Sequence, residues 1–382
     1  MRQFLRAVSD FHEKDYLHRL RDLAAKKAPC GFFYLGNDAD LPKFLNILHA
    51  QGITVSVIVN LGGELPSAGV PVIHAAKFPA LAEKPQTMIL YGAGVPSCFA
   101  SFFERWDIEC LVLNVPQNIQ HDTDFYDQHL VDLYEAYSGF HDEESRLAFL
   151  GGWKYVSSSS IRDFHLAPEP QYFLSGFTVL AGDIVIDGGA YDGGTSRDFA
   201  SVAGASGKVY AFEMDEENFK KCQAAAEHFG FVAENMGLAS HRQMAKYMHT
   251  GAQATASRMD AGGDRTASFT SIDVYVKENQ LPRVDFIKMD IEGAELDALH
   301  GAALTIARWK PRMAICAYHK PEDLWVLQQY IQSLRPDYEF AFRHYGIDVS
   351  EYLYTDETRQ LLSDFHLPWS VPSNCERVLY CR

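Results

Sequence analysis

The chain has 382 residues, which is the length of about two ordinary domains rather than one. Its hydrophobic share of 47% and its charged share of 22% are those of a globular protein, so extensive disorder is excluded. Its 34 Lys and Arg against 50 Asp and Glu give a formal net charge of −16, which argues against nucleic acid or anionic membranes as partners because like charges repel.

The first part of the chain predicts an α/β domain. Residues 1–28 have the apolar spacing of an amphipathic helix, which Pro29 and Gly31 end. Apolar runs then alternate with helical segments, and an alternation of this kind predicts a parallel sheet with right-handed crossovers. Buried strands are expected at 31–36, 53–60, 87–94 and 108–114. Residues 1–150 are therefore expected to form a smaller Rossmann-like domain with a leading helix.

Residues 151–171 are rich in Gly, Ser and Pro, a composition typical of a linker, so a second domain is expected over 172–382. Its strands are expected at 183–189, 208–213, 231–239, 284–290, 312–319, 338–345 and 376–382, with a polar loop at 250–267. No helix separates the last two strands, which predicts an antiparallel hairpin at the edge of a parallel sheet. This is the arrangement of the seven-stranded methyltransferase variant of the Rossmann fold.

Seven cysteines are scattered along the chain without a C-x-x-C pair. Such a pattern predicts neither a disulfide framework nor a zinc site and favours a reducing compartment. The amino terminus lacks the apolar core of a signal peptide, and no apolar stretch approaches the roughly 18–20 residues that span a bilayer. We therefore expect a cytoplasmic protein with neither a membrane nor a nucleic acid as partner.

A glycine-rich turn, DGGAYDGG (187–194), closes the first strand of the second domain. Its D-x-G-x-x-x-G spacing differs from the G-x-G-x-x-G of pyrophosphate binders. A sulfonium cofactor has no phosphate to bind, so Gly189 and Gly193 would let the backbone approach it and Asp187 would place a carboxylate near its cationic end. Taken alone, the motif is also compatible with a glycine turn that binds nothing.

Glu213 ends the next strand, where an acid bonds the ribose hydroxyls of adenosine-type cofactors. Asp290 and Glu292 follow a later strand in KMDIEGAE (288–295), and His319 ends the strand after that. Because ligands of open α/β sheets bind outside the carboxyl ends of the strands, these groups should converge with Asp187 at one edge of the sheet. The alternative is that Asp290 caps the helix that starts near 294, and that Glu292 and Glu295 favour the positive start of that helix.

Over roughly residues 140–382 the chain resembles the FkbM family of S-adenosylmethionine-dependent methyltransferases. The segments that carry the resemblance are VIDGGAYDGGTS, VYAFEMDEEN, TSIDVYV, VDFIKMDIEGAELDALHGA, AYHKPEDLW, FRHY and RVLY. The chain is similar in particular to the two-domain members with an N-terminal Rossmann-like domain. The resemblance implies S-adenosyl-L-methionine as cofactor and O-methylation of a hydroxyl on a sugar, polyketide or related metabolite.

The resemblance also implies roles for individual residues. It places Asp290 and Glu292 at the junction of cofactor and acceptor. The chain departs from the family pattern at Tyr191, where many members have Asn. The implied cofactor-binding residues are Asp187, Gly189, Ala190, Gly193, Glu213 and Asp290. The partner is expected to be a small-molecule or glycan hydroxyl acceptor, and a homo-oligomer is left open.

Methyl transfer needs an aligned acceptor oxygen and a group that takes its proton. His319 is the first candidate for this base because histidine titrates near neutral pH, and Asp290 is the second. With Glu292 they form the expected catalytic set. The same three residues could hold a magnesium or manganese ion, but their spacing in the sequence does not support one, so no metal ligand is predicted.

The alternative function is an NAD(P)-dependent oxidoreductase that uses the Gly92-Ala93-Gly94 turn of the first domain. Such a site requires a ribose-binding acid about 20 residues past the turn. Residues 111–114 at that distance are apolar or amide, and Glu109 comes before the end of the strand, so the fit is poor. A third alternative is a protein that binds the cofactor without catalysis.

Overall fold

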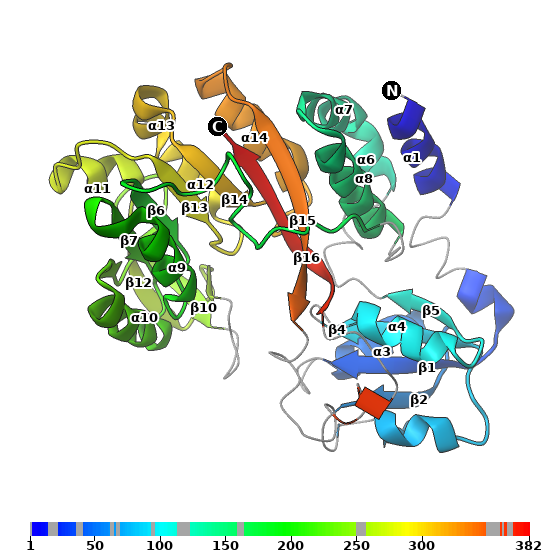
Figure 1. Cartoon of the computed structure of the whole chain (residues 1–382). Coiled ribbons are helices and arrows are strands. Elements are labelled where there is room, and N and C mark those ends of the chain that lie inside the picture. The colour runs from blue at the N-terminus through cyan, green and yellow to red at the C-terminus, as the bar shows by residue number, and fades with distance from the viewer. Residues whose placement is uncertain are drawn as a thin grey trace. The chain divides into compact units, whose positions relative to one another are not determined.

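The computed structural model describes residues 2–13, 22–35, 41–61, 65, 69–92, 96–112, 123–158, 164–249, 257–348, 360, 363–364 and 370–382 (Figure 1). The chain divides into two compact units. The first comprises Met1–Tyr137, Leu147–Ala167 and His344–Glu376, and the second comprises Ser138–Arg146, Pro168–Arg343 and Arg377–Arg382. Among the described residues, no helix is long and apolar enough to cross a membrane.

The first unit contains a five-stranded sheet of order β3-β2-β1-β4-β5, in which all neighbouring strands are parallel. The strands are β1 (Cys30–Leu35), β2 (Val55–Asn60), β3 (Val72–His74), β4 (Thr87–Gly92) and β5 (Glu109–Val112). Its helices include α1 (Arg2–Glu13), α3 (Leu41–Ala50), η1 (Ala75–Ala80), α4 (Pro96–Glu104) and α6 (Thr123–Gln128). The predicted parallel sheet is confirmed, and the short strand β3 was not predicted.

Both faces of this sheet are buried. Phe33 packs in one apolar cluster, whereas its neighbours Phe32 and Tyr34 pack in another. Val57 and Ile58 on β2 divide between the same two clusters. Because side chains of a strand alternate between its faces, a strand covered on both sides must be apolar at every position, which is why these strands appear as continuous apolar runs.

Helices α7 (Leu130–Gly139) and α8 (Glu143–Ser158) follow. The boundary expected between residues 150 and 151 lies inside α8, and the first eight residues of the expected linker belong to this helix. Gly151 and Gly152, whose composition suggested a linker, are buried helical residues. The change in composition at residue 151 therefore does not mark the end of this helix.

The second unit contains a seven-stranded sheet of order β15-β16-β14-β13-β6-β7-β8. The strands are β6 (Ile184–Gly188), β7 (Lys208–Phe212), β8 (Val232–Glu234), β13 (Phe286–Met289), β14 (Arg312–Cys316), β15 (Phe340–Asp348) and β16 (Ser370–Cys381). β6, β7, β8, β13 and β14 pair in parallel, and β16 pairs with β14 in the antiparallel direction. The predicted seven-stranded fold is confirmed.

The order of the strands reverses at β6. The chain runs outward from β6 through α9 (Gly194–Ala203), η2 (Gly204–Ser206), β7 and α10 (Glu216–Phe229) to β8, and it later returns to the other side of β6 at β13. Right-handed crossovers in opposite directions place their helices on opposite faces of a sheet. Accordingly α9 packs on α10, and α14 (Asp323–Leu334) packs on α12 (Glu295–His300) and α13 (Ala303–Trp309) (Figure 1).

A second, four-stranded sheet in this unit, of order β11-β10-β12-β9, was not predicted. Its strands are β9 (Gly237–Leu238), β10 (Gln243–His249), β11 (Ser257–Met259) and β12 (Arg265–Thr270), which α11 (Ile272–Glu278) follows. The strand expected at 231–239 is divided between β8 and β9 in the two sheets. The polar loop expected at 250–267 includes β11 and the start of β12, and its residues 250–256 lie outside the described residues.

Candidate active site

The predicted site residues lie at the carboxyl ends of four neighbouring strands. Asp187 is in β6, Glu213 directly follows β7, Asp290 directly follows β13, and His319 comes three residues after β14. In the register of the sheet, Gly188 lies opposite Phe212 on one side and Met289 on the other, so the ends of β6, β7 and β13 are level. Their predicted placement at one edge of the sheet is confirmed.

The glycines of the turn after β6 are explained by packing within the protein. Gly189 has φ +74°, and a Cβ atom there would overlap the carbonyl oxygen of Asp290. Gly193 has φ +84°, and a Cβ atom there would lie 2.9 Å from Phe231 and 3.0 Å from Ala225. The left-handed backbone and the close contacts both require glycine. Of the two, Gly189 also lines a pocket, which is described below.

The side chain of Asp187 does not point toward a ligand as the sequence analysis expected. Its side chain is completely buried, accepts a hydrogen bond from Ser196 Oγ at 2.5 Å and lies 3.1 Å from Lys288 Nζ. Lys288 Nζ also donates to the carbonyl oxygens of Gly188 and Gly189, at 3.0 and 2.7 Å. Asp187 thus stabilises the turn through its ion pair with Lys288. The expectation that Asp187 reaches the cationic end of a cofactor is corrected. Ala190 is also buried, and its N–H donates to the carbonyl of Phe212.

Glu213 lines a pocket that opens to solvent at the ends of β6 and β7. The lining is mainly apolar and consists of Gly189, Phe212, Glu213, Met214, Gly237, Leu238, Met259, Phe269, Ile291 and Ala294. The Glu213 carboxylate accepts the N–H groups of Tyr191 at 2.9 Å and Asp215 at 2.8 Å, which fix its direction. Burial raises the pKa of Glu213 to about 7.

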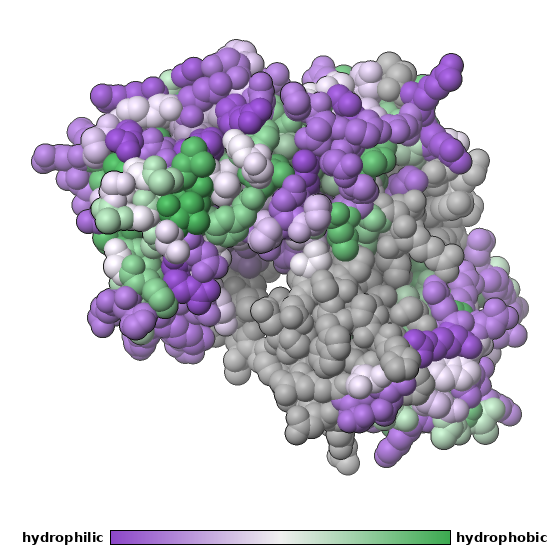
Figure 2. All heavy atoms as spheres, in the orientation of Figure 1, coloured by the Kyte–Doolittle hydropathy of each residue, from purple (hydrophilic) through white to green (hydrophobic). Residues whose placement is uncertain are grey.

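This pocket fits an adenosine. Apolar walls suit the adenine ring, and one oriented carboxylate suits the ribose hydroxyls. Figure 2 shows apolar side chains gathered on the face of this unit that is in view, within an otherwise hydrophilic surface. The residues present therefore fit the nucleoside part of the cofactor that the family resemblance implies.

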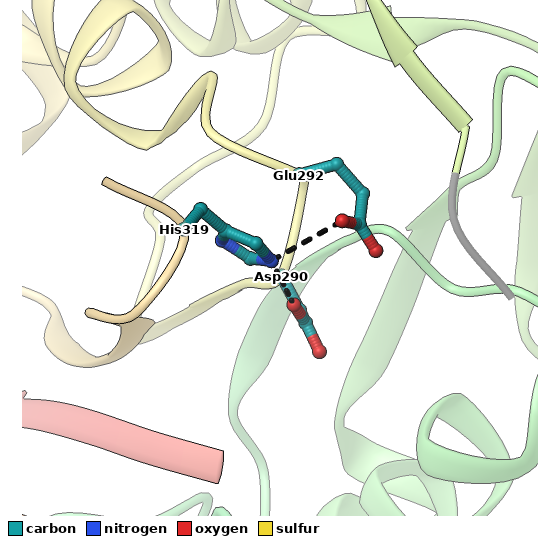
Figure 3. Close-up of side chains that lie close together, drawn as sticks. All are labelled: Asp290, Glu292 and His319. Carbon is teal, nitrogen blue, oxygen red and sulfur yellow. Dashed lines mark ion pairs between the residues drawn. The ribbon is translucent and has the colours of Figure 1, made fainter. Parts of the chain in front are cut away.

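An acid–imidazole cluster lies beside the pocket (Figure 3). His319 Nε2 is 3.5 Å from Asp290 Oδ1 and 3.4 Å from Glu292 Oε2, and His319 Nδ1 is 2.9 Å from Glu295 Oε1. The His319 side chain is 8% exposed, whereas those of Asp290 and Glu292 are 24% and 29% exposed. Asp290 and Glu292 are therefore the members of the cluster that a ligand can reach.

The protonation of His319 differs from the expectation. Burial lowers its pKa, but the negative charges of Glu295, Asp290 and Glu292 outweigh this effect and raise the pKa to about 10. An imidazole with this pKa keeps its proton at neutral pH and cannot accept another. This raised pKa argues against His319 as the general base, and its expected catalytic role stays a prediction.

Asp290 does not cap the following helix. Helix α12 starts after Ala294 without a side-chain cap, and Glu295 of its first turn accepts the N–H of Ile291 at 2.9 Å. The Asp290 oxygens instead accept hydrogen bonds from Tyr172 at 2.9 Å and Tyr318 at 3.0 Å. The capping alternative is wrong because the carboxylate points to these phenols.

Sequence reasoning missed several residues of the site. Tyr172 and Tyr318 hold Asp290, Lys288 holds the turn, and Glu295 holds His319. One signal was available for Lys288, a charged residue within the apolar run of a buried strand, where it needs a partner. Tyr172 lies 118 residues before Asp290, and no local pattern links them.

The first unit offers little support for a dinucleotide site. Gly92 ends β4, and residues 93–95 of the predicted turn lie outside the described part of the chain. Glu109 begins β5, lies opposite Thr87 at the start of β4, and pairs with Lys26 at 3.4 Å. It is therefore at the opposite edge of the sheet from Gly92, where it cannot bind a ribose held by that turn.

The order of the larger sheet, its antiparallel strand β16 and the pocket at the ends of β6 and β7 together define a Rossmann-like fold of the methyltransferase type. Residues 187–364 match the family model of the methyltransferase FkbM domain. The chain thus carries an FkbM methyltransferase domain, and the predicted family is confirmed. Family and fold support an S-adenosylmethionine-dependent methyltransferase.

One solved structure that matches over the whole chain shares this fold, and other solved structures match parts of the chain. The methyltransferase FkbM of Methylobacillus flagellatus KT is 21% identical with a TM-score of 0.71, and the match covers 100% of this chain and 98% of that one. An Aeropyrum pernix fibrillarin with bound S-adenosyl-L-methionine (12% identity, TM-score 0.29) matches over 55% of this chain and 71% of its own. An O-methyltransferase of Thermotoga maritima (16%, 0.30) matches over 53% and 60%. None of the curated proteins matches.

Proposed function

We propose that the protein transfers the methyl group of S-adenosylmethionine to a hydroxyl of a sugar, polyketide or related small molecule or glycan. The observation that carries the proposal is that the Glu213 pocket and the acid–imidazole cluster lie next to each other at one edge of the sheet. The pocket of Glu213 is lined by Gly189 and Ile291, and Ile291 lies between Asp290 and Glu292 of the acid–imidazole cluster. A nucleoside cofactor and an acceptor bound there would meet at the boundary of the two.

In this proposal Glu213 accepts hydrogen bonds from the ribose hydroxyls, and the apolar lining covers the adenine. Its carboxylate is already oriented by two backbone N–H groups, so little freedom is lost when the ligand binds. When bound, the cofactor supplies an electrophilic methyl group on a positively charged sulfur. Asp290 and Glu292 place negative charge at that end of the pocket.

The acceptor hydroxyl needs a partner for its proton, because a neutral alcohol is a weak nucleophile. Glu292 is suited to this role, since its side chain is the most exposed of the cluster. With the cofactor bound, Glu292 would accept the hydroxyl proton as the acceptor oxygen takes the methyl group, and the electrons of the broken carbon–sulfur bond would stay on sulfur. Asp290, held by two tyrosines, aligns the acceptor.

Calorimetric titration with S-adenosylhomocysteine tests the cofactor. We expect one molecule to bind per chain, and Glu213→Ala to weaken binding about tenfold or more, which corresponds to a charged hydrogen bond of about 1.5–3 kcal/mol. Glu216→Ala, which changes an exposed acid at the start of α10, is the matched control. Unchanged affinity in a folded Glu213→Ala variant, or binding of NADPH in place of S-adenosylhomocysteine, would contradict the proposal.

Transfer to oxygen is tested with a labelled methyl donor and paired acceptors, each sugar or polyol being compared with its amino analogue. We expect label on the hydroxyl compounds and a loss of about 10²–10⁴-fold in turnover in Glu292→Gln, as for removal of a positioned base. Label on the amines alone would refute O-methylation and leave the cofactor assignment intact.

A further inference from the structure

We infer that Asp290, Glu292 and His319 form a binding site for a divalent cation of the magnesium and manganese class. The site follows from the geometry of the three side chains, which offer two carboxylate oxygens and one imidazole nitrogen within 4.8 Å of one another (Figure 3). Its role in catalysis, the activation of the acceptor hydroxyl, rests on the proposed function.

The distances within the cluster are those of ligands around an ion. His319 Nε2 lies 3.5 and 3.4 Å from the nearest oxygens of Asp290 and Glu292, whereas a direct charge-assisted N–H···O bond measures about 2.7–2.9 Å. Metal–ligand bonds of about 2.1 Å separate neighbouring ligands by about 3.0 Å in an octahedron and about 3.4 Å in a tetrahedron. The separations in the cluster therefore resemble edges of a coordination polyhedron.

The imidazole is oriented as in metal sites. A histidine that binds a metal through one ring nitrogen usually donates the N–H of the other to a carboxylate. His319 Nδ1 is 2.9 Å from Oε1 of Glu295, which is fully buried and is itself fixed by the N–H of Ile291. This contact directs Nε2 toward Asp290 and Glu292, as Figure 3 shows.

The carboxylate ligand is oriented in the same way. Tyr172 and Tyr318 donate to the two different oxygens of Asp290, at 2.9 and 3.0 Å, so the plane of this carboxylate is fixed. Outer hydrogen bonds of this kind hold metal ligands in position and are part of most metal sites. The three proposed ligands follow the ends of β13 and β14, and their ligand atoms lie within 4.8 Å of one another.

The local charge favours a cation. Asp290, Glu292 and Glu295 all lie within 3.5 Å of the single imidazole of His319, so carboxylates outnumber the positive groups of the cluster. Lys288, the nearby buried cation, is held by Asp187 and by two backbone carbonyls. A divalent ion would take the place of the proton on Nε2 of His319 and would balance the remaining negative charge.

The donor set indicates the class of ion. Two carboxylates and one imidazole, without a thiolate, suit Mn²⁺ and Mg²⁺, which complete their coordination with water. One such position would take the acceptor hydroxyl oxygen. Coordination would make that hydroxyl more acidic. Its proton would pass to the Glu292 oxygen that does not bind the ion. The acceptor oxygen would bond to the methyl carbon, and the electron pair of the broken carbon–sulfur bond would stay on sulfur.

The test is a titration of the EDTA-treated full-length protein with Mn²⁺, in which free Mn²⁺ is measured by electron paramagnetic resonance. We expect one ion per chain, and at least tenfold weaker binding in His319→Ala and in Glu292→Gln. Glu216→Gln is the matched control and should bind like the wild type. Absence of Mn²⁺ binding to the wild type, or wild-type affinity for Mn²⁺ in either of the two cluster variants, would overturn the site.

S-adenosylhomocysteine titration of the same samples separates this inference from the proposed function. Each variant should keep its affinity for S-adenosylhomocysteine, which shows that it is folded. If the wild type binds Mn²⁺ but no S-adenosylhomocysteine, the proposed function fails and the cation site stands. If EDTA leaves the rate of methyl transfer to an acceptor unchanged, the catalytic role of the ion is refuted.

Discussion

We predict that Glu213 makes the binding of S-adenosylhomocysteine dependent on pH. Its pKa of about 7, raised by burial, means that the carboxylate that would accept the ribose hydroxyls is only partly ionised at neutral pH. About ten in eleven molecules carry the ionised group at pH 8 and about one in eleven at pH 6. The affinity for S-adenosylhomocysteine should therefore fall about tenfold from pH 8 to pH 6.

The substitution Glu213→Gln removes this titration, since an amide has no proton to gain in this range. Calorimetry at pH 6, 7 and 8 should give a weak affinity that hardly changes with pH in the variant, whereas Glu216→Gln should follow the wild type. The reasoning is refuted if wild-type affinity is the same at pH 6 and pH 8, or if the Glu213→Gln variant keeps the wild-type pH dependence.

The same titration affects the free energy of unfolding. An unfolded carboxyl ionises near 4.5 and the folded one near 7, so the folded state binds more protons between these values and loses stability as the pH rises. From pH 5 to pH 8 this loss is about 2.5 kcal/mol for the wild type. Glu213→Gln does not titrate, so its stability relative to the wild type should rise by about that amount from pH 5 to pH 8 in urea denaturation. An equal difference at both pH values would show that Glu213 does not titrate in this range.

Three further predictions concern the turn after β6. Lys288→Met leaves the charge of the buried Asp187 uncompensated and should lower the free energy of unfolding by about 3–5 kcal/mol in urea denaturation; a loss below about 1 kcal/mol would contradict the buried ion pair. Tyr191→Asn replaces a residue with φ +52° by one that tolerates this conformation, and it should raise stability by up to about 1 kcal/mol and keep S-adenosylhomocysteine binding; clear destabilisation would show that the tyrosine ring is needed. Gly189→Ala places a Cβ against the carbonyl of Asp290 and should reduce S-adenosylhomocysteine binding at least tenfold, whereas wild-type binding would show that the turn can shift at no cost.

The sequence was sufficient to predict the central strands of the seven-stranded sheet and the edge of that sheet that carries the site. A parallel strand buried on both faces is an uninterrupted apolar run, so β6, β7, β13 and β14 were located from local composition. The acid or imidazole after each run then lies at the carboxyl edge, because all these strands point the same way. Glu213, Asp290 and His319 were found by this reasoning.

Contacts between distant segments could not be predicted in this way. The four-stranded sheet is made of short strands of mixed polarity, whose composition resembles a loop until their partners are known. Asp187 was correctly placed at the end of β6 but wrongly turned toward a ligand, because its partner Lys288 lies on β13, which is next to β6 only in the folded sheet.

The chemistry of the cluster was decided by the tertiary structure alone. The sequence supplied a histidine that would titrate near neutral pH, and three carboxylates brought within 3.5 Å of it raise its pKa to about 10. A side chain keeps its identity from the sequence, but its charge and reactivity depend on the groups that surround it and on the water that burial removes. For that reason Asp290, Glu292 and His319 could be predicted from the sequence as site residues, whereas the charge on His319 could not.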